Sequence, residues 1–169
     1  MTKTVTFYFD FLSPFAYLAH HHLLKKRKAL DFELEYHPLD LAYVKVQSGN
    51  TGPPNRSIPP KIKYLMEDLK RWAAIYKVPL APPESLFSER TNIGMFIAQE
   101  RGLATQYASA VWERTWGSGG TFDTPNLVRD VARSLNWDVA EFECLIDEPK
   151  FRRRDKQSSD AAIKNGVFG

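Results

Sequence analysis

The chain has 169 residues, of which 43% are hydrophobic and 25% are charged, and its formal net charge at pH 7 is +3. This length and composition are typical of a globular protein with a sizeable core. The small charge argues against nucleic-acid binding, and no apolar run is long enough to cross a membrane. One cysteine excludes an internal disulfide and fits a reducing compartment, so we expect a cytoplasmic protein.

The first predicted elements are a strand, a tight turn and a helix. Residues 4–11 are rich in β-branched and aromatic side chains, which is typical of a buried strand. Ser13 and Pro14 then predict a helix start, because serine is a favoured N-cap and proline fits the first helical position. Residues 32–36 alternate apolar and charged side chains and predict a second strand. A crossover of this length indicates a parallel, right-handed βαβ unit.

From about residue 39 onward the pattern is helical, interrupted by turns rich in proline and glycine. Residues 47–60 predict a loop. The expected helices begin near residue 62 and run to Val78, and then cover residues 92–101, 105–116, 124–135, 138–146 and 159–165. Gly102 and Gly166 are placed to end two of these helices. The basic runs 25–28 and 152–154 are interpreted as solvated faces.

The turn at Ser13 is the strongest candidate for chemistry. A hydroxyl at the positive end of a helix dipole attracts anions, including thiolates, although an ordinary N-cap explains the same residue. An apolar strand that runs into Phe-x-Cys-Pro-x-Cys at a helix start is the active-site pattern of thioredoxin-like disulfide oxidoreductases. Here Ser13 and Ala16 occupy the two cysteine positions, and Cys144 is far away in sequence. Dithiol exchange at this turn is therefore excluded, because it needs two thiols.

The stretch Tyr-Phe-Asp-Phe-Leu-Ser-Pro-Phe-Ala-Tyr-Leu-Ala at residues 8–19 resembles the start of 2-hydroxychromene-2-carboxylate isomerases. These are glutathione-dependent relatives of the kappa-class glutathione transferases. The stretches 48–53, 60–64 with 68–69, and 166–169 agree with the same family, in order along the whole chain. The resemblance implies an α/β protein with a thioredoxin-like βαβ core and a large all-helical insertion.

The family plan divides the chain into three parts. Residues 1–39 would form the N-terminal half of the thioredoxin-like domain, residues 40–165 the helical insertion, and residues 166–169 the start of the return to the first domain. The family continues beyond this point into a cis-proline loop, a strand pair and a helix. We therefore expect the functional protein to extend past Gly169.

The resemblance also implies the function. The implied reaction is a glutathione-dependent isomerisation of 2-hydroxychromene-2-carboxylate, or of a related aromatic-degradation intermediate, by reversible thiolate addition. The resemblance also implies a homodimer. Ser13 would stabilise the thiolate, and Asn50 and Lys61 match the family's glutathione-contacting positions. Two alternatives stay open: a kappa-like transferase, which consumes glutathione, and a non-catalytic thioredoxin-like module that binds a partner.

Several candidate residues have a second explanation. Asn50 lies in a glycine- and proline-rich loop, where asparagine also serves turn geometry. Lys61 stands at a helix start, where the dipole disfavours a cation unless an anionic ligand is near. Trp72 and Trp116 fit either an aromatic substrate pocket or the core.

Two further groups are interpreted as structural. Consecutive helical residues point in different directions, so His20, His21 and His22 do not converge on one metal ion, and no metal site is expected. Cys144 is expected to be a small buried group in a helix.

Overall fold

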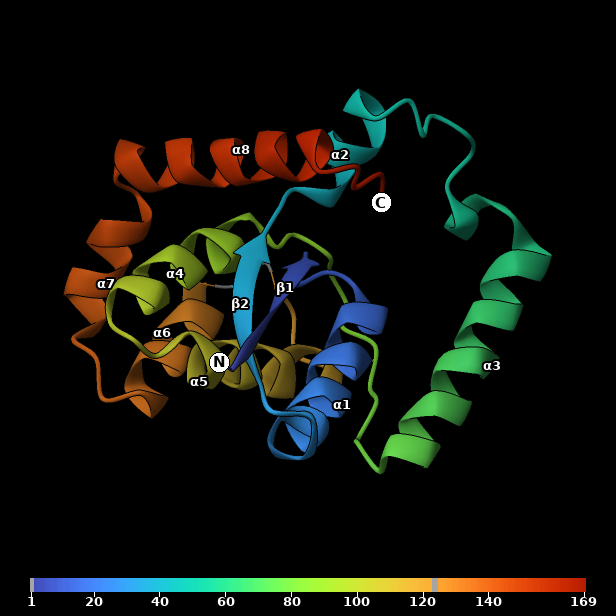
Figure 1. Cartoon of the computed structure of the whole chain (residues 1–169), viewed down its shortest axis with the longest axis horizontal. Helices are drawn as coiled ribbons and strands as arrows, with labels where there is room; N and C mark the ends of the chain where they lie inside the picture. Colours follow the sequence, from blue (N-terminus) through green and yellow to red (C-terminus); the bar gives the residue numbers. More distant parts are fainter. Residues whose placement is uncertain (1, 123–124) are drawn as a thin grey trace.

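The protein is described by a computed structural model that covers residues 2–122 and 125–169, with eight α-helices and two strands in those ranges (Figure 1). Strand β1 (Lys3–Phe9), helix α1 (Pro14–Leu30) and strand β2 (Phe32–Pro38) form the first unit. The strands pair in parallel, from Lys3 opposite Phe32 to Phe9 opposite Pro38. The predicted parallel βαβ unit is therefore confirmed.

The turn between β1 and α1 explains why the first strand is shorter than predicted. β1 ends at Phe9, because the Ser13 amide donates to the Asp10 carbonyl at 3.0 Å and closes a tight turn. The Ser13 backbone is extended (φ −88°, ψ 116°), and its Oγ accepts from the Ala16 amide at 3.3 Å. Ser13 is thus an N-cap, as the sequence predicts. Asp31 ends α1 in the left-handed conformation, at φ 49°.

The remaining chain is helical. Its helices are α2 (Leu41–Gln47), α3 (Pro59–Tyr76), α4 (Glu89–Glu100), α5 (Ala104–Trp112), α6 (Pro125–Ser134), α7 (Val139–Ile146) and α8 (Pro149–Lys164), with a 3-10 turn at Asn55–Ser57. Asp138 caps α7, and Gly102 (φ 68°) and Gly166 (φ 84°) follow the ends of α4 and α8, as expected. The predicted helix start at Thr124 lies outside the described residues.

The sequence patterns differ from the structure at three helices. Helix α2 had no separate prediction, although Asp40 caps it by accepting from the Tyr43 amide at 3.0 Å. The predicted helix 105–116 is α5 followed by one π-helical turn, Glu113–Gly117. Helix α8 begins ten residues earlier than predicted, at Pro149 instead of 159. Its buried side is carried by Phe151, Ser159 and Ala162 alone, so its first half lacks a continuous apolar stripe.

The core lies between the sheet and helices α4 to α6. Phe9, Phe11, Tyr17 and Trp112 are almost fully buried there, and the Phe11 and Trp112 rings are 4.9 Å apart. Helices α2 and α8 pack against each other beyond the carboxyl ends of the two strands (Figure 1). Helix α3 stands to one side, where it contacts α1 (Figure 1). The division into parts at residues 39/40 and 165/166 stays a prediction.

Candidate active site

The turn between β1 and α1 is held by side chains from distant parts of the chain. The Phe11 amide donates to Asn92 Oδ1 at 3.3 Å. The Phe11 carbonyl accepts from two indoles, Trp112 Nε1 at 3.3 Å and Trp116 Nε1 at 3.1 Å. Both backbone groups of Phe11 are therefore satisfied inside the protein, which fixes the path of the turn towards Ser13.

A buried carboxylate lies directly behind this turn. Asp10 is only 3% exposed, and its Oδ1 accepts from the Leu12 amide at 3.2 Å, from Asn92 Nδ2 at 3.1 Å and from the Ser88 hydroxyl. Its Oδ2 accepts from the Leu41 amide at 2.9 Å. Burial raises the pKa of Asp10, and these four hydrogen bonds act in the opposite direction.

Ser13 itself is half-buried at the start of the 17-residue helix α1. Its oxygen is the acceptor in the cap, so the cap does not use the hydroxyl proton. That proton can be donated outward to an anion, and the positive end of the helix dipole favours negative charge at the same place. The geometry therefore fits the predicted role of Ser13, although the cap is also a sufficient reason for a serine.

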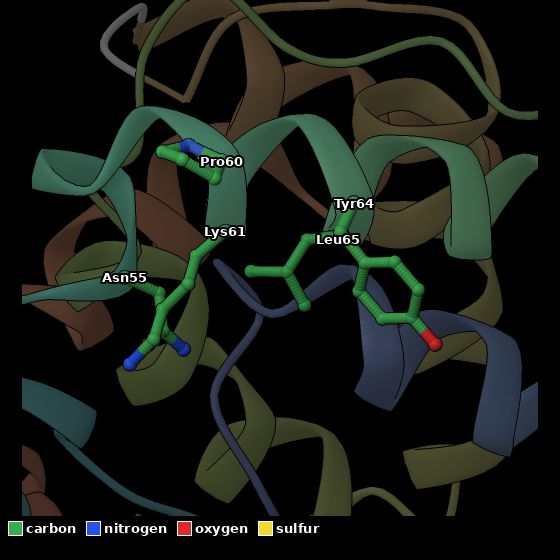
Figure 2. Close-up of a pocket in the computed structure, with 5 residues that line it drawn as sticks. All are labelled: Asn55, Pro60, Lys61, Tyr64 and Leu65. Atoms are coloured by element: carbon green, nitrogen blue, oxygen red, sulfur yellow. The ribbon is translucent and has the colours of Figure 1, made fainter.

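Lys61 borders a hollow on the first turns of α3. The hollow has a volume of about 380 Å³ and is lined by Asn55, Pro60, Lys61, Tyr64 and Leu65. In Figure 2, Lys61, Tyr64 and Leu65 extend from the same side of α3, and Asn55 lies close to Lys61. A cation near a helix start and an amide group together suit an anionic or peptide-like ligand.

A second hollow, of about 390 Å³, lies between α1 and α3, and we call it the α1–α3 groove. It is lined mainly by apolar and aromatic side chains, namely Phe15, Leu18, Ala19, His22, Leu23, Asp68, Trp72 and Tyr76. Phe15 and Trp72 are 44% and 42% exposed, and the Trp72 and Tyr76 rings are 5.4 Å apart. Phe15 is in the first turn of α1, two residues after the Ser13 cap, so one end of the groove lies near the Ser13 turn.

The other predicted site residues lie elsewhere. Asn50 is exposed in the loop after α2, and its Nδ2 donates to the Phe168 carbonyl at 3.1 Å. Trp116 is 5% exposed and hydrogen-bonds Phe11, so it belongs to the core, whereas Trp72 lines the α1–α3 groove. The two tryptophans therefore do not share one pocket wall.

The three histidines have separate surroundings. His20 is buried, and its Nε2 and Nδ1 lie 2.9 Å from Ser109 Oγ and 3.3 Å from the Tyr36 hydroxyl. Burial lowers the pKa of His20 to about 3. The His21 ring is 4.8 Å from the Tyr17 ring, and His22 stacks on Tyr76 at 4.6 Å. Within the described residues, no three His, Cys, Asp or Glu side chains are grouped for a metal ion.

The expectation for Cys144 is wrong. The thiol side chain is exposed. Helix α7 buries Phe142 and Ile146, and Cys144 lies between these two positions on the opposite side of the helix.

A group of acids that the sequence patterns did not indicate lies behind the Ser13 turn. Asp10, Asp40, Glu89 and Asp155 line a cavity of about 310 Å³, together with Leu12, Ala42, Leu86, Phe87, Ser88 and Asn92. Burial, followed by repulsion from Asp10, Asp40 and Glu89, raises the pKa of Asp155 to about 7. Residues from the turn after β1 and from the regions of α2, α4 and α8 meet here, so no local motif could have revealed the group.

Comparison with known proteins identifies the family and the fold of the chain. The DSBA-like thioredoxin domain family matches residues 4–169. A 2-hydroxychromene-2-carboxylate isomerase from Pseudomonas sp. (strain C18) is 40% identical over 98% of this chain and 78% of its own length. A solved structure of a 2-hydroxychromene-2-carboxylate isomerase superposes with a TM-score of 0.94 at 39% identity, over 98% of this chain and 82% of that chain.

A more distant relative is glutathione S-transferase kappa 2 from Caenorhabditis elegans, which is 28% identical over 99% of this chain and 78% of its own length. In the described part of the chain, no helix has the length and apolar character needed to cross a membrane. The expected thioredoxin-like fold is confirmed, and the chain belongs to the DSBA-like thioredoxin domain family and, within it, to the 2-hydroxychromene-2-carboxylate isomerases.

Proposed function

We propose that this protein is a glutathione-dependent isomerase of 2-hydroxychromene-2-carboxylate or of a closely related aromatic-degradation intermediate. The observation that carries the proposal is the 40% identity, over 98% of the chain, to a protein named for this reaction. The glutathione part rests on the more distant relatives named as kappa glutathione transferases and on the Ser13 turn.

The residues present fit glutathione as a cofactor. Ser13 combines a hydroxyl proton that the cap leaves available with the N-terminus of α1. A free thiol has a pKa of about 8.5 and is mostly protonated at neutral pH, and this position would favour its anion. Lys61 and Asn55 offer a cation and an amide for the anionic or peptide parts of the molecule. Asn50 would contribute a polar contact from the loop after α2.

Glutathione, when bound, supplies a thiol that adds reversibly to an electrophilic carbon of the substrate, so that a former double bond can rotate before the sulfur leaves. The role of Ser13 is to hold the sulfur and to stabilise its negative charge by donating a hydrogen bond. Phe15 and Trp72 present exposed aromatic surface in the α1–α3 groove, and we assign the aromatic ring of the substrate to that surface.

Titration calorimetry with glutathione, followed by a stoichiometric assay, tests the proposal. An isomerase returns all of the added glutathione at the end of turnover, whereas a kappa-like transferase consumes one molecule for each molecule of product. The alternative of a non-catalytic thioredoxin-like module predicts that the protein binds no glutathione. We also propose a cytoplasmic homodimer, and sedimentation equilibrium measures its oligomeric state.

A further inference from the structure

The Asp10 carboxylate connects three separate segments at the point where Ser13 is presented. It accepts the Leu12 amide of the turn, the Leu41 amide at the start of α2, and side-chain donors from Ser88 and Asn92 at the start of α4. The segments are distant in sequence, since Ser88 and Asn92 follow Asp10 by 78 and 82 residues. One side chain thus fixes the turn relative to two helices.

Burial raises the pKa of Asp10, but three of its four hydrogen-bond partners can only donate and therefore favour the ionised carboxylate. Leu12 and Leu41 contribute backbone N–H groups and Asn92 contributes an amide N–H, and none of these three groups can accept a hydrogen bond from a protonated acid. A charged acceptor strengthens each of these hydrogen bonds. A buried charge with four donors is therefore a rigid junction, and loss of one acceptor oxygen leaves a buried donor without a partner.

Asp10 is connected to Ser13 through hydrogen bonds to the main chain of the turn. The Asp10 carbonyl accepts the Ser13 amide at 3.0 Å, and the Asp10 carboxylate holds the Leu12 amide between them. The orientation of the Asp10 side chain therefore determines where the turn places the Ser13 hydroxyl.

We propose that Asp10 is a positioning residue for the reaction, which acts through the turn to hold the Ser13 hydroxyl against the glutathione sulfur. This inference rests on the role of Ser13 proposed above. Asp10 is buried behind the turn and does not need to contact the substrate or glutathione. The protein would need its charged form, because an isosteric amide has only one acceptor oxygen and presents an N–H₂ group to donors.

The test is Asp10→Asn, with Phe151→Leu as the control. Phe151 is a fully buried side chain of α8, so the control lowers stability without removing a contact of the turn. We expect Asp10→Asn to lower kcat by about 10- to 100-fold, as displaced catalytic groups do. Glutathione affinity should fall less than kcat, because only the contact of Ser13 with the sulfur is disturbed and the contacts proposed for Lys61 and Asn55 remain. Phe151→Leu should keep its kcat while folded.

Hydrogen exchange of the Leu12 and Ser13 amides gives a second readout that needs no glutathione. Exchange at both amides should become faster in Asp10→Asn than in Phe151→Leu, measured where both variants are folded. If Asp10→Asn does not fold, Ser88→Ala removes one donor but leaves the charge, and a smaller loss of kcat with faster exchange is expected. A folded variant with normal kcat and normal exchange would overturn the proposal.

These outcomes separate the two proposals. If the unchanged protein neither binds nor uses glutathione, the proposed function fails, and amide exchange alone then decides whether Asp10 fixes the turn. If the unchanged protein is active and Asp10→Asn is equally active, only the positioning role fails.

Discussion

Removal of the Ser13 hydroxyl separates its catalytic role from its capping role. In Ser13→Ala the Ala16 amide loses its acceptor at 3.3 Å, and loss of a cap of this kind costs about 1 kcal/mol of folding free energy. Loss of a hydrogen-bond donor to a developing anion lowers the rate by about 100- to 1000-fold, which is about 2.7–4 kcal/mol in activation free energy. The effect on turnover should therefore clearly exceed the effect on stability.

Two companion variants sharpen this measurement. Ser13→Gly also lacks the hydroxyl, but glycine is tolerated at an N-cap and costs only a few tenths of a kcal/mol. Asp138→Ala removes the cap of α7, where the carboxylate accepts the Glu141 amide at 2.8 Å, and it leaves the Ser13 turn intact. Urea unfolding and steady-state isomerisation are measured for all three variants. Turnover near normal in folded Ser13→Ala, or an equal loss in Asp138→Ala, would refute the reasoning.

Three further predictions concern ligand affinity and pH. Lys61→Ala should weaken glutathione binding in calorimetry, and the effect should be larger at low salt than at high salt because ions screen the attraction. The control Lys63→Ala, two residues further along the same helix, should leave the affinity unchanged. The pKa of Asp155 is raised to about 7, which predicts that the protein loses stability as the pH rises from about 4 to about 7 and that its stability is constant above this range. Urea unfolding at pH 8 should therefore show that Asp155→Asn raises the free energy of unfolding by about 2–4 kcal/mol. An equal gain at pH 4 would contradict this prediction. The pKa of His20 is lowered to about 3, which predicts that the protein loses stability as the pH falls below about 6.5. A His20→Gln variant should therefore lose less stability in acid than the unchanged protein. An unchanged pH dependence of stability would exclude His20 as the source of the loss.

The local elements of the site were predictable, because their signals lie in consecutive residues. The apolar strand, the Ser-Pro helix start and the parallel return strand follow from propensity, capping and periodicity. Helix α8 was predicted too short, since charged residues at 152–154 follow Phe151 and conceal its buried side. Cys144 was wrongly placed because its short helix was not assigned a buried face.

The network that holds the turn could not be read from the sequence. Phe11 is bonded to Asn92, Trp112 and Trp116, which are 81 to 105 residues away in the chain. In the sequence, Asn92 marks only a helix start, and Trp116 is compatible with a pocket or with the core. The contacts depend on how α4 and α5 pack on the sheet, which is a property of the tertiary fold.

The π-helical turn Glu113–Gly117 limits how the length of this segment can change during evolution. Trp112 precedes the turn and Trp116 lies within it, yet both indoles reach the same Phe11 carbonyl. Deletion of one residue between them would close the π-helical turn to a regular α-helical one and reduce the spacing of the two indoles from four residues to three. One indole would then leave the carbonyl, so relatives that keep the Ser13 turn should tolerate substitutions in this segment more readily than insertions or deletions.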